Sequence, residues 1–140
     1  MDIRQITDRF FAAPQIEAAD FAALAEAGFG LNNRPDNEVG PDQHSETMRA
    51  AAESAGLKYV VNPLTMDTMT PDRQALQRDS AAGCEGKVLA YCRSGTRSTI
   101  CWALSQAKDM DVADIVNAAA NGGYDVSGLV PHLEAIKSQS

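Results

Sequence analysis

One stretch constrains the fold more than any other: residues 87–104, KVLAYCRSGTRSTICWAL. The apolar run 88–91 predicts a buried strand, residues 92–97 predict a turn, and Ser98 is expected to open a strongly apolar helix. A thiol, that of Cys92, is therefore expected at the start of a helix.

The turn 92–97 has the composition of an anion-binding loop. The free N–H groups of such a turn and of the first helical turn converge on one point, where the helix dipole adds positive potential. Gly95 can adopt backbone angles closed to other residues, which lets consecutive N–H groups point inward, and Arg93 and Arg97 are close in the sequence. These surroundings favour the thiolate of Cys92, the nucleophilic form of cysteine. A buried cysteine that merely ends a strand is the competing interpretation, but it does not explain the spacing of glycine and arginine.

The segment resembles the active-site loop of the cysteine-dependent phosphatases, Cys-x-x-Gly-x-x-Arg-Ser/Thr, with one residue missing between Gly95 and Arg97. With four residues between Cys92 and Arg97, the loop has the length found in rhodanese sulfurtransferases. Over nearly its whole length the chain is similar to the bacterial beta-lactamase hydrolase-like, phosphatase-like domain family. That resemblance implies the fold of dual-specificity phosphatases, an α/β three-layer sandwich with a mainly parallel sheet and helices on both faces.

The resemblance also implies site residues. Cys92 would be the nucleophile, Arg97 the oxyanion clamp, and Ser98 a hydrogen-bond donor to the sulfur. Asp67 matches the general-acid position, although Asp72 is close by and a solvated loop acid is an equally good interpretation. Further residues expected to contact the anion are Arg34, Arg93, Ser94, Gly95 and Thr96. Where phosphatases usually carry histidine before the cysteine, this chain has Tyr91.

The pattern along the chain predicts strands interleaved with helices, which favours a mainly parallel sheet covered on both faces. Strands are expected within 2–13, 29–33, 57–61 and 88–91. Helices are expected at 18–27, 43–55, 71–82, 98–108, 112–120 and 129–137, with Thr70 and Asp111 as caps. Arg34 and Asp36 would then lie at the carboxyl end of a strand, where α/β sheets bind ligands.

Length and charge narrow the possible functions. One domain, residues 1–140, is expected at this size, and a net charge of −7 argues against a nucleic-acid partner. No run of eighteen apolar residues and no apolar signal core exists in the sequence, so we expect a cytoplasmic chain with no membrane partner. Three irregularly spaced cysteines and two histidines favour neither a disulfide framework nor zinc, and no cofactor is expected. Cys101 is expected to be inert, and Cys84 is a candidate to resolve an oxidised Cys92.

Three functions use the same loop. A phosphatase would form a phosphocysteine at Cys92, with Asp67 protonating the leaving oxygen of a small or protein phosphomonoester. A sulfurtransferase would form a persulfide at Cys92, with sulfur supplied by a partner metallo-hydrolase or dioxygenase. A weakly active regulatory module would only bind the oxyanion. The short loop favours sulfur, whereas the overall resemblance and Asp67 favour phosphate, and we expect a phosphatase.

Overall fold

The structure of the protein is a computed structural model, and it describes residues 2–24, 29–83 and 86–139. These residues form a five-stranded sheet in the order β1-β2-β5-β3-β4. The strands are β1 (Arg4–Gln5), β2 (Phe10–Ala13), β3 (Phe29–Asn32), β4 (Lys58–Val61) and β5 (Val88–Tyr91). β1 pairs antiparallel with β2, and every other pairing is parallel. The expected mainly parallel sheet is confirmed.

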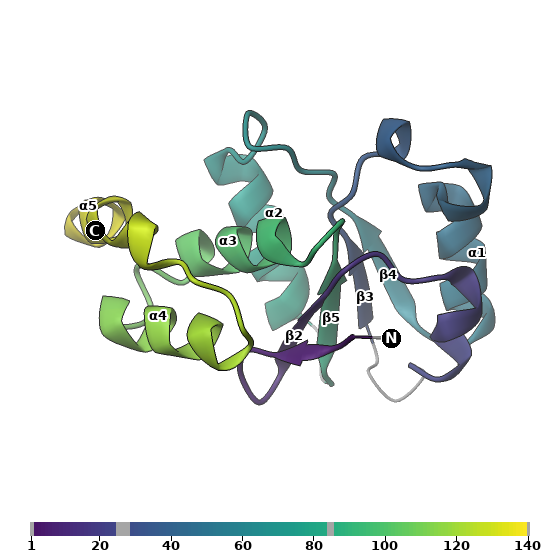
Figure 1. Cartoon of the computed structure of the whole chain (residues 1–140), viewed down its shortest axis with the longest axis horizontal. Coiled ribbons are helices and arrows are strands. Elements are labelled where there is room, and N and C mark those ends of the chain that lie inside the picture. Colours follow the sequence, from purple (N-terminus) through teal and green to yellow (C-terminus); the bar gives the residue numbers. More distant parts are fainter. Residues whose placement is uncertain (1, 25–28, 84–85, 140) are drawn as a thin grey trace.

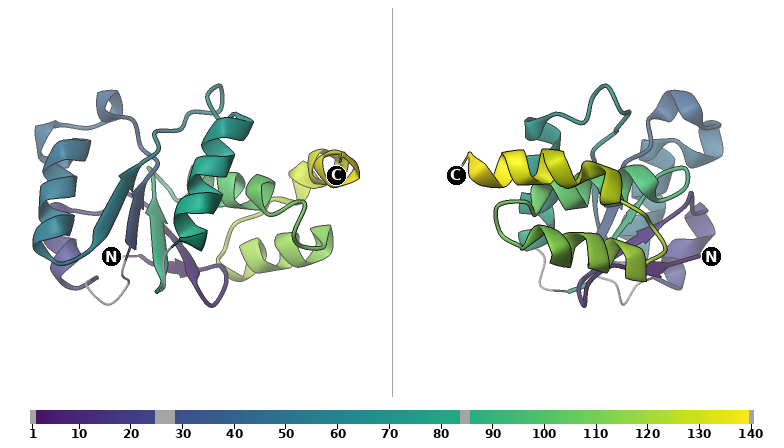
Figure 2. Two further views of the ribbon diagram at one scale, coloured as in Figure 1. Left: turned by 180° about the vertical axis from the view of Figure 1, so that it is seen from behind. Right: turned by 60° about the vertical axis from the view of Figure 1, so that its left-hand side comes forward.

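Helices cover both faces of the sheet (Figures 1 and 2). The α-helices are α1 (Ser45–Ser54), α2 (Pro71–Ala82), α3 (Thr96–Ser105), α4 (Val112–Asn121) and α5 (Val130–Ser138). α1 lies on one side of the sheet and α2 to α5 lie on the other. The fold is thus the expected three-layer sandwich. Among the helices of the described residues, none has the length and apolar character needed to cross a membrane.

Alternation along the central strand explains the two layers. Val88 and Ala90 of β5 pack in the cluster formed with α3, α4 and α5, whereas Leu89 and Tyr91 pack in the cluster formed with α1. Successive side chains of a strand point to opposite faces, so a strand buried on both faces reads as an unbroken apolar run. All four residues of β5 are buried accordingly.

Three expected helices differ from the structure. The helix expected at 18–27 is a 3₁₀ helix, η1 (Ala18–Ala22), and residues 25–28 lie outside the described part. The helix expected from residue 43 begins at Ser45, after the short 3₁₀ helix η4 (Pro41–Gln43). α3 begins at Thr96, two residues before the expected start, because Gly95 takes φ = 89° and ends the turn. The strong start signal, Thr70 before Pro71, correctly placed α2.

Candidate active site around Cys92

The loops that follow β2, β3, β4 and β5 meet at one edge of the sheet. Parallel strands carry their carboxyl ends on the same side, and this edge is where open α/β sheets bind ligands. In the structure, Asn33 N–H donates to Tyr91 O (2.8 Å), and Leu64 N–H donates to Asn33 O (2.9 Å). These bonds tie the loops after β3 and β4 to the end of β5, directly beside Cys92.

Cys92 lies in the middle of this edge and is completely buried (0% exposed). Its N–H donates to Ala13 O at the end of β2 (3.3 Å), which fixes the start of the loop. The Gly95 N–H donates to the Cys92 sulfur at 3.2 Å. The N–H groups of Arg93, Ser94, Arg97 and Ser98 donate no hydrogen bond to any of the described residues. The loop therefore presents several unpaired donors next to a sulfur that already accepts one N–H.

The side chains of the loop mostly stabilise its own shape. Ser94 Oγ donates to Thr96 Oγ1 (2.9 Å) and accepts the Thr96 N–H (3.3 Å). Thr99 Oγ1 donates to Gly95 O at 2.8 Å, inside the protein. Ser94 and Thr96, which the sequence assigned to anion binding, thus bond to each other through their hydroxyl groups. The Arg93 side chain is exposed, and its carbonyl accepts the Gln15 N–H (3.3 Å).

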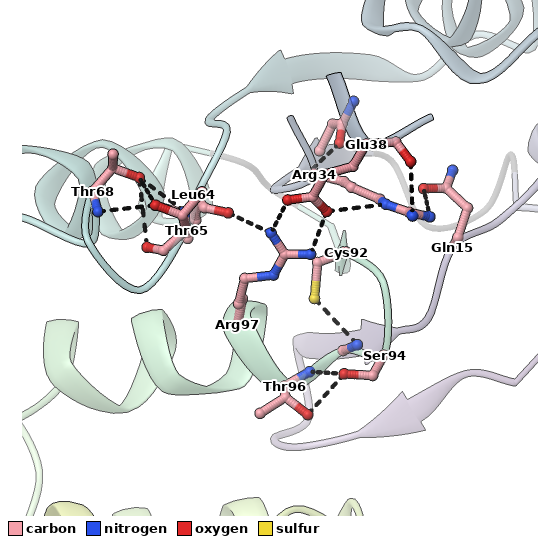
Figure 3. A network of polar contacts seen from close by, with 12 residues as sticks. Gln15, Arg34, Glu38, Leu64, Thr65, Thr68, Cys92, Ser94, Thr96 and Arg97 are labelled. Atoms are coloured by element: carbon pink, nitrogen blue, oxygen red, sulfur yellow. Dashed lines mark hydrogen bonds and ion pairs between the residues drawn. The ribbon is translucent and has the colours of Figure 1, made fainter. Parts of the chain in front are cut away.

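Arg97 is held beside the sulfur by two other loops (Figure 3). Its Nη1 donates to Leu64 O (2.6 Å) and to Glu38 Oε2 (3.0 Å), and its Nη2 donates to Glu38 Oε1 (2.8 Å). The hydrogen bond to Glu38 is the main cause that raises the pKa of Arg97, and Cys92 contributes in the same direction. The same bond lowers the pKa of Glu38, with a further contribution from Arg34. Glu38 is therefore ionised at neutral pH and forms a paired contact with the guanidinium.

Glu38 is a site residue that the sequence analysis missed. It lies at the end of the 3₁₀ helix η3 (Asp36–Glu38) in the loop after β3. Arg34 binds it from the other side, with Nε at 3.3 Å from Glu38 Oε1, and also donates to Gln15 Oε1 (3.3 Å). Asp36, expected with Arg34 at the carboxyl end of a strand, accepts both the N–H and the hydroxyl of Ser45 at the start of α1. In the sequence, Glu38 could have been recognised as a partner of Arg34, because the two residues are four positions apart and carry opposite charges.

The assignment of Ser98 as a donor to the sulfur is wrong in this structure. Its hydroxyl donates to Asn33 Oδ1 at 2.7 Å, and a serine hydroxyl has only one proton to give. The cause is the early start of α3, which makes Ser98 the third helical residue and leaves Gly95 as the cap. The donor that contacts the sulfur is the Gly95 N–H.

Asp67 is exposed in a turn between β4 and α2. Thr65 and Thr68 close that turn with hydrogen bonds between their backbone and side-chain groups. The turn follows Leu64, whose carbonyl holds Arg97, so the loop that carries Asp67 is anchored to the site. No contact of the Asp67 carboxylate with a described residue is formed, and Asp67 remains a prediction as the general acid.

Three further residues singled out in the sequence are two cysteines and the tyrosine before Cys92. Cys101 is buried in α3, and burial raises the pKa of its thiol to about 12, which keeps it protonated and unreactive. Cys84, considered as a resolving cysteine, lies outside the described residues. The Tyr91 hydroxyl is buried and bonds to the Tyr59 hydroxyl (2.8 Å) on the face of the sheet covered by α1. The Tyr91 side chain therefore packs and bonds within the core and not at the Cys92 loop.

We expect Glu38→Gln to lower the free energy of unfolding by about 0.5–1 kcal/mol at pH 7, the size typical of a partly exposed ion pair. Because the pKa of Glu38 is lowered in the folded protein, its stabilisation is present above the unfolded-state pKa and is lost as the pH falls through the folded-state value. Urea unfolding at pH 7 and in strong acid measures this. In acid, the wild type and Glu38→Gln should have the same free energy of unfolding. The matched control is Glu53→Gln, because Glu53 is an exposed glutamate of α1. An equal loss at both pH values would contradict the ion-pair explanation.

Comparison with known proteins gives a consistent result. Residues 2–109 match the family described as "Beta-lactamase hydrolase-like protein, phosphatase-like domain". A beta-lactamase hydrolase-like protein of Agrobacterium fabrum is 34% identical over 94% of this chain, and one of Xylella fastidiosa is 35% identical over 96%. The chain spans only about a third of the length of these curated relatives (34% and 32%).

Solved structures share the whole fold. A provisionally assigned phosphatase from Neisseria meningitidis has a TM-score of 0.82 at 26% identity, with 97% of this chain and 99% of that one covered. TpbA of P. aeruginosa, in a cysteine-to-serine form in complex with pTyr, has a TM-score of 0.61 at 14% identity, with 99% of this chain and 91% of that one covered. At that identity TpbA supports the fold alone.

Proposed function

The chain belongs to the beta-lactamase hydrolase-like, phosphatase-like domain family, and from this premise we propose that it is a cysteine-dependent phosphatase that acts on a phosphomonoester through a phosphocysteine at Cys92. One observation carries the proposal. The Arg97 guanidinium is held beside the sulfur of a cysteine that accepts the Gly95 N–H, at a loop with unpaired N–H donors. Such a cluster stabilises both a thiolate and the oxygens of a transferring phosphoryl group.

The first chemical step is attack of the Cys92 thiolate on phosphorus. The S–P bond forms as the P–O ester bond breaks, and the leaving oxygen takes a proton from a general acid. Because Cys92 is completely buried, the phosphoryl group reaches it only after the groups around the sulfur move apart. Glu38 occupies both terminal nitrogens of Arg97, so bidentate capture of the substrate on that edge requires Glu38 to release one of them.

The second step is attack of water on the phosphocysteine, which returns phosphate and the thiolate. The Gly95 N–H stabilises the departing sulfur in place of a serine hydroxyl, because the Ser98 proton is given to Asn33. Glu38 cannot supply the proton of the first step, since its lowered pKa keeps it ionised at neutral pH. Asp67 is our candidate for that acid, because its loop is anchored to Arg97 through Leu64.

A sulfurtransferase is the second candidate, favoured by the four residues between Cys92 and Arg97. A tighter ring has less room for three phosphoryl oxygens than for one sulfur atom. In this reaction the Cys92 thiolate attacks the sulfane sulfur of thiosulfate, the S–S bond breaks, and sulfite leaves. Cyanide then takes the outer sulfur as thiocyanate and restores the thiolate, so no general acid is needed.

One experiment separates these functions. Purified protein is given p-nitrophenyl phosphate and, separately, thiosulfate with cyanide, and each is repeated with Cys92→Ser. Phosphate release that the variant lacks supports the phosphatase, and thiocyanate formation that the variant lacks supports the sulfurtransferase. Phosphate binding without either turnover would show a regulatory anion-binding module and overturn both enzymatic proposals.

We expect Asp67→Asn to slow hydrolysis of an alkyl phosphate by about 10²-fold and that of p-nitrophenyl phosphate by less than about threefold. A poor leaving group needs a proton in the transition state, whereas p-nitrophenolate does not. Steady-state kcat/KM with both substrates measures the difference. Asp72→Asn is the matched control, since Asp72 is also exposed and lies in the first turn of α2. Equal slowing of both substrates would remove Asp67 from this role, and a selective effect of Asp72→Asn would transfer it to Asp72.

A partner protein is part of the proposal. The curated relatives are about three times as long as this chain, which covers 34% and 32% of them. We propose that a metallo-hydrolase or a dioxygenase acts together with this domain. We also propose that the protein acts in the cytoplasm, where the Cys92 thiol would stay reduced. Co-purification from the native host would test the partnership.

A further inference from the structure

The Ser94–Gly95 peptide is held from two opposite sides. On one side, Gly95 N–H donates to the sulfur of Cys92 at 3.2 Å. On the other side, the carbonyl oxygen of Ser94 accepts a hydrogen bond from the Tyr124 hydroxyl at 3.0 Å. No cis peptide occurs among the described residues, and in a planar trans peptide the C=O and N–H bonds point in opposite directions. Whatever fixes the carbonyl therefore also fixes where the N–H points.

The glycine in this peptide permits the reversed orientation as well. Gly95 has φ = 89°, and a glycine in a short loop populates positive and negative φ with similar ease. A reversed peptide would present the Ser94 carbonyl oxygen to the sulfur, and a carbonyl dipole in that direction repels a thiolate. The hydrogen bond at the carbonyl therefore favours the orientation that stabilises the thiolate over the one that destabilises it.

Tyr124 is placed by the end of α4. Its N–H donates to Ala119 O at 2.9 Å, and the Gly123 N–H donates to Ala120 O at 2.9 Å, with Gly123 at φ = 90°. This is the hydrogen-bonding pattern of a helix that ends on a left-handed glycine. A Cβ atom on Gly95 would collide with the Tyr124 hydroxyl, so the close approach of the ring depends on that glycine. Tyr124 itself lies beyond residues 2–109, which match the family.

The Tyr124 hydroxyl keeps its proton under the conditions in which the site would work. Burial raises the pKa of Tyr124, and the neighbouring Cys92 raises it further. A protonated phenol can donate to the Ser94 carbonyl throughout the neutral range. Arg4 lowers the pKa of Tyr124 and Asp2 raises it, both by smaller amounts than burial and Cys92. The Arg97 guanidinium lies beside the sulfur, and the Glu38 carboxylate is paired with it.

We propose that Tyr124 is a positioning residue, which holds the Ser94–Gly95 peptide so that its N–H points at the Cys92 sulfur. The role deepens the proposed function, on which its catalytic meaning rests. It also makes the C-terminal helical segment part of the active site, because α4 and the turn after it set the position of the hydroxyl.

The test is Tyr124→Phe, which removes the hydroxyl and leaves the ring. The rate of Cys92 alkylation by iodoacetamide is followed from pH 5 to pH 10 by mass spectrometry of the peptide that contains Cys92. We expect the pH of half-maximal rate to be about one unit higher in Tyr124→Phe than in the wild type. At any pH below both midpoints, this shift corresponds to about tenfold less thiolate in the variant. A variant that only opens the site would change the alkylation rate by the same factor at every pH. A variant that destabilises the thiolate would instead shift the pH of half-maximal rate.

Asp125→Asn is the matched control. Asp125 adjoins Tyr124 and bonds to the Ser127 N–H (2.9 Å), not to the loop, so this variant should keep the wild-type midpoint. Urea unfolding should show that both variants fold. Superimposable profiles for wild type and Tyr124→Phe would overturn the positioning role. Because alkylation needs no phosphatase turnover, a wild-type protein that releases no phosphate would refute the proposed function while this test still decides about Tyr124.

Discussion

Cys92→Ser is expected to lower phosphate release from p-nitrophenyl phosphate by at least about 10⁴-fold. A serine hydroxyl at this position stays protonated and attacks phosphorus poorly, whereas N–H donors and a guanidinium beside a sulfur stabilise the nucleophilic thiolate. The substitution changes one atom, and the serine can still accept the Gly95 N–H that now reaches the sulfur. The fold should therefore survive. The measurement is kcat/KM under identical conditions for both proteins.

Cys101→Ala provides the control for Cys92→Ser. Cys101 lies on α3, is as completely buried as Cys92, and is kept protonated by burial. We expect its replacement to cost stability of about 1 kcal/mol through the lost packing and to leave kcat/KM within about threefold of wild type. Retained activity in Cys92→Ser, or equal losses in the two variants, would refute the thiolate mechanism.

Arg97→Lys is expected to lower kcat/KM by about 10²–10³-fold, the range observed when one fixed donor to a transition state is removed. Lysine carries the same charge but no planar fork, so it cannot keep the paired contact with Glu38 and the bond to Leu64 O together. The cation then no longer has a fixed position beside the sulfur. Steady-state kinetics with p-nitrophenyl phosphate measures the loss.

The control for Arg97→Lys is Arg93→Lys. Arg93 is in the same loop, but its side chain is exposed and forms no hydrogen bond or ion pair with the described residues, whereas its carbonyl accepts the Gln15 N–H. We expect Arg93→Lys to stay within about threefold of wild type. If Arg97→Lys were equally active, charge alone would suffice at this position and the geometric role of the guanidinium would be wrong.

Several elements of the fold could be predicted from local sequence. Val88–Tyr91 was recognisable as a doubly buried strand from its unbroken apolar run, and Pro71–Ala82 from Thr70 followed by proline. The start of α3 was misplaced because Ser98 looked like a cap, whereas the glycine before Thr96 ends the turn. The segment after Ala18 looked helical by propensity, yet its described part is a short 3₁₀ helix, η1, packed through Phe21 against Tyr59 and α1. Helix propensity is a weak guide because tertiary packing often overrides it.

The sequence by itself determined that a cysteine would follow a buried strand and face the start of a helix, with glycine and arginine at fixed spacing after it. These are neighbours along the chain, and their relative positions follow from local backbone geometry. Only the tertiary structure decided which distant groups complete the site: Glu38 on Arg97, Asn33 on Ser98, and Tyr124 on the Ser94 carbonyl. Each of these contacts joins residues that are 30 to 65 positions apart in the sequence. Their positions depend on strand order and helix packing, which no local pattern encodes.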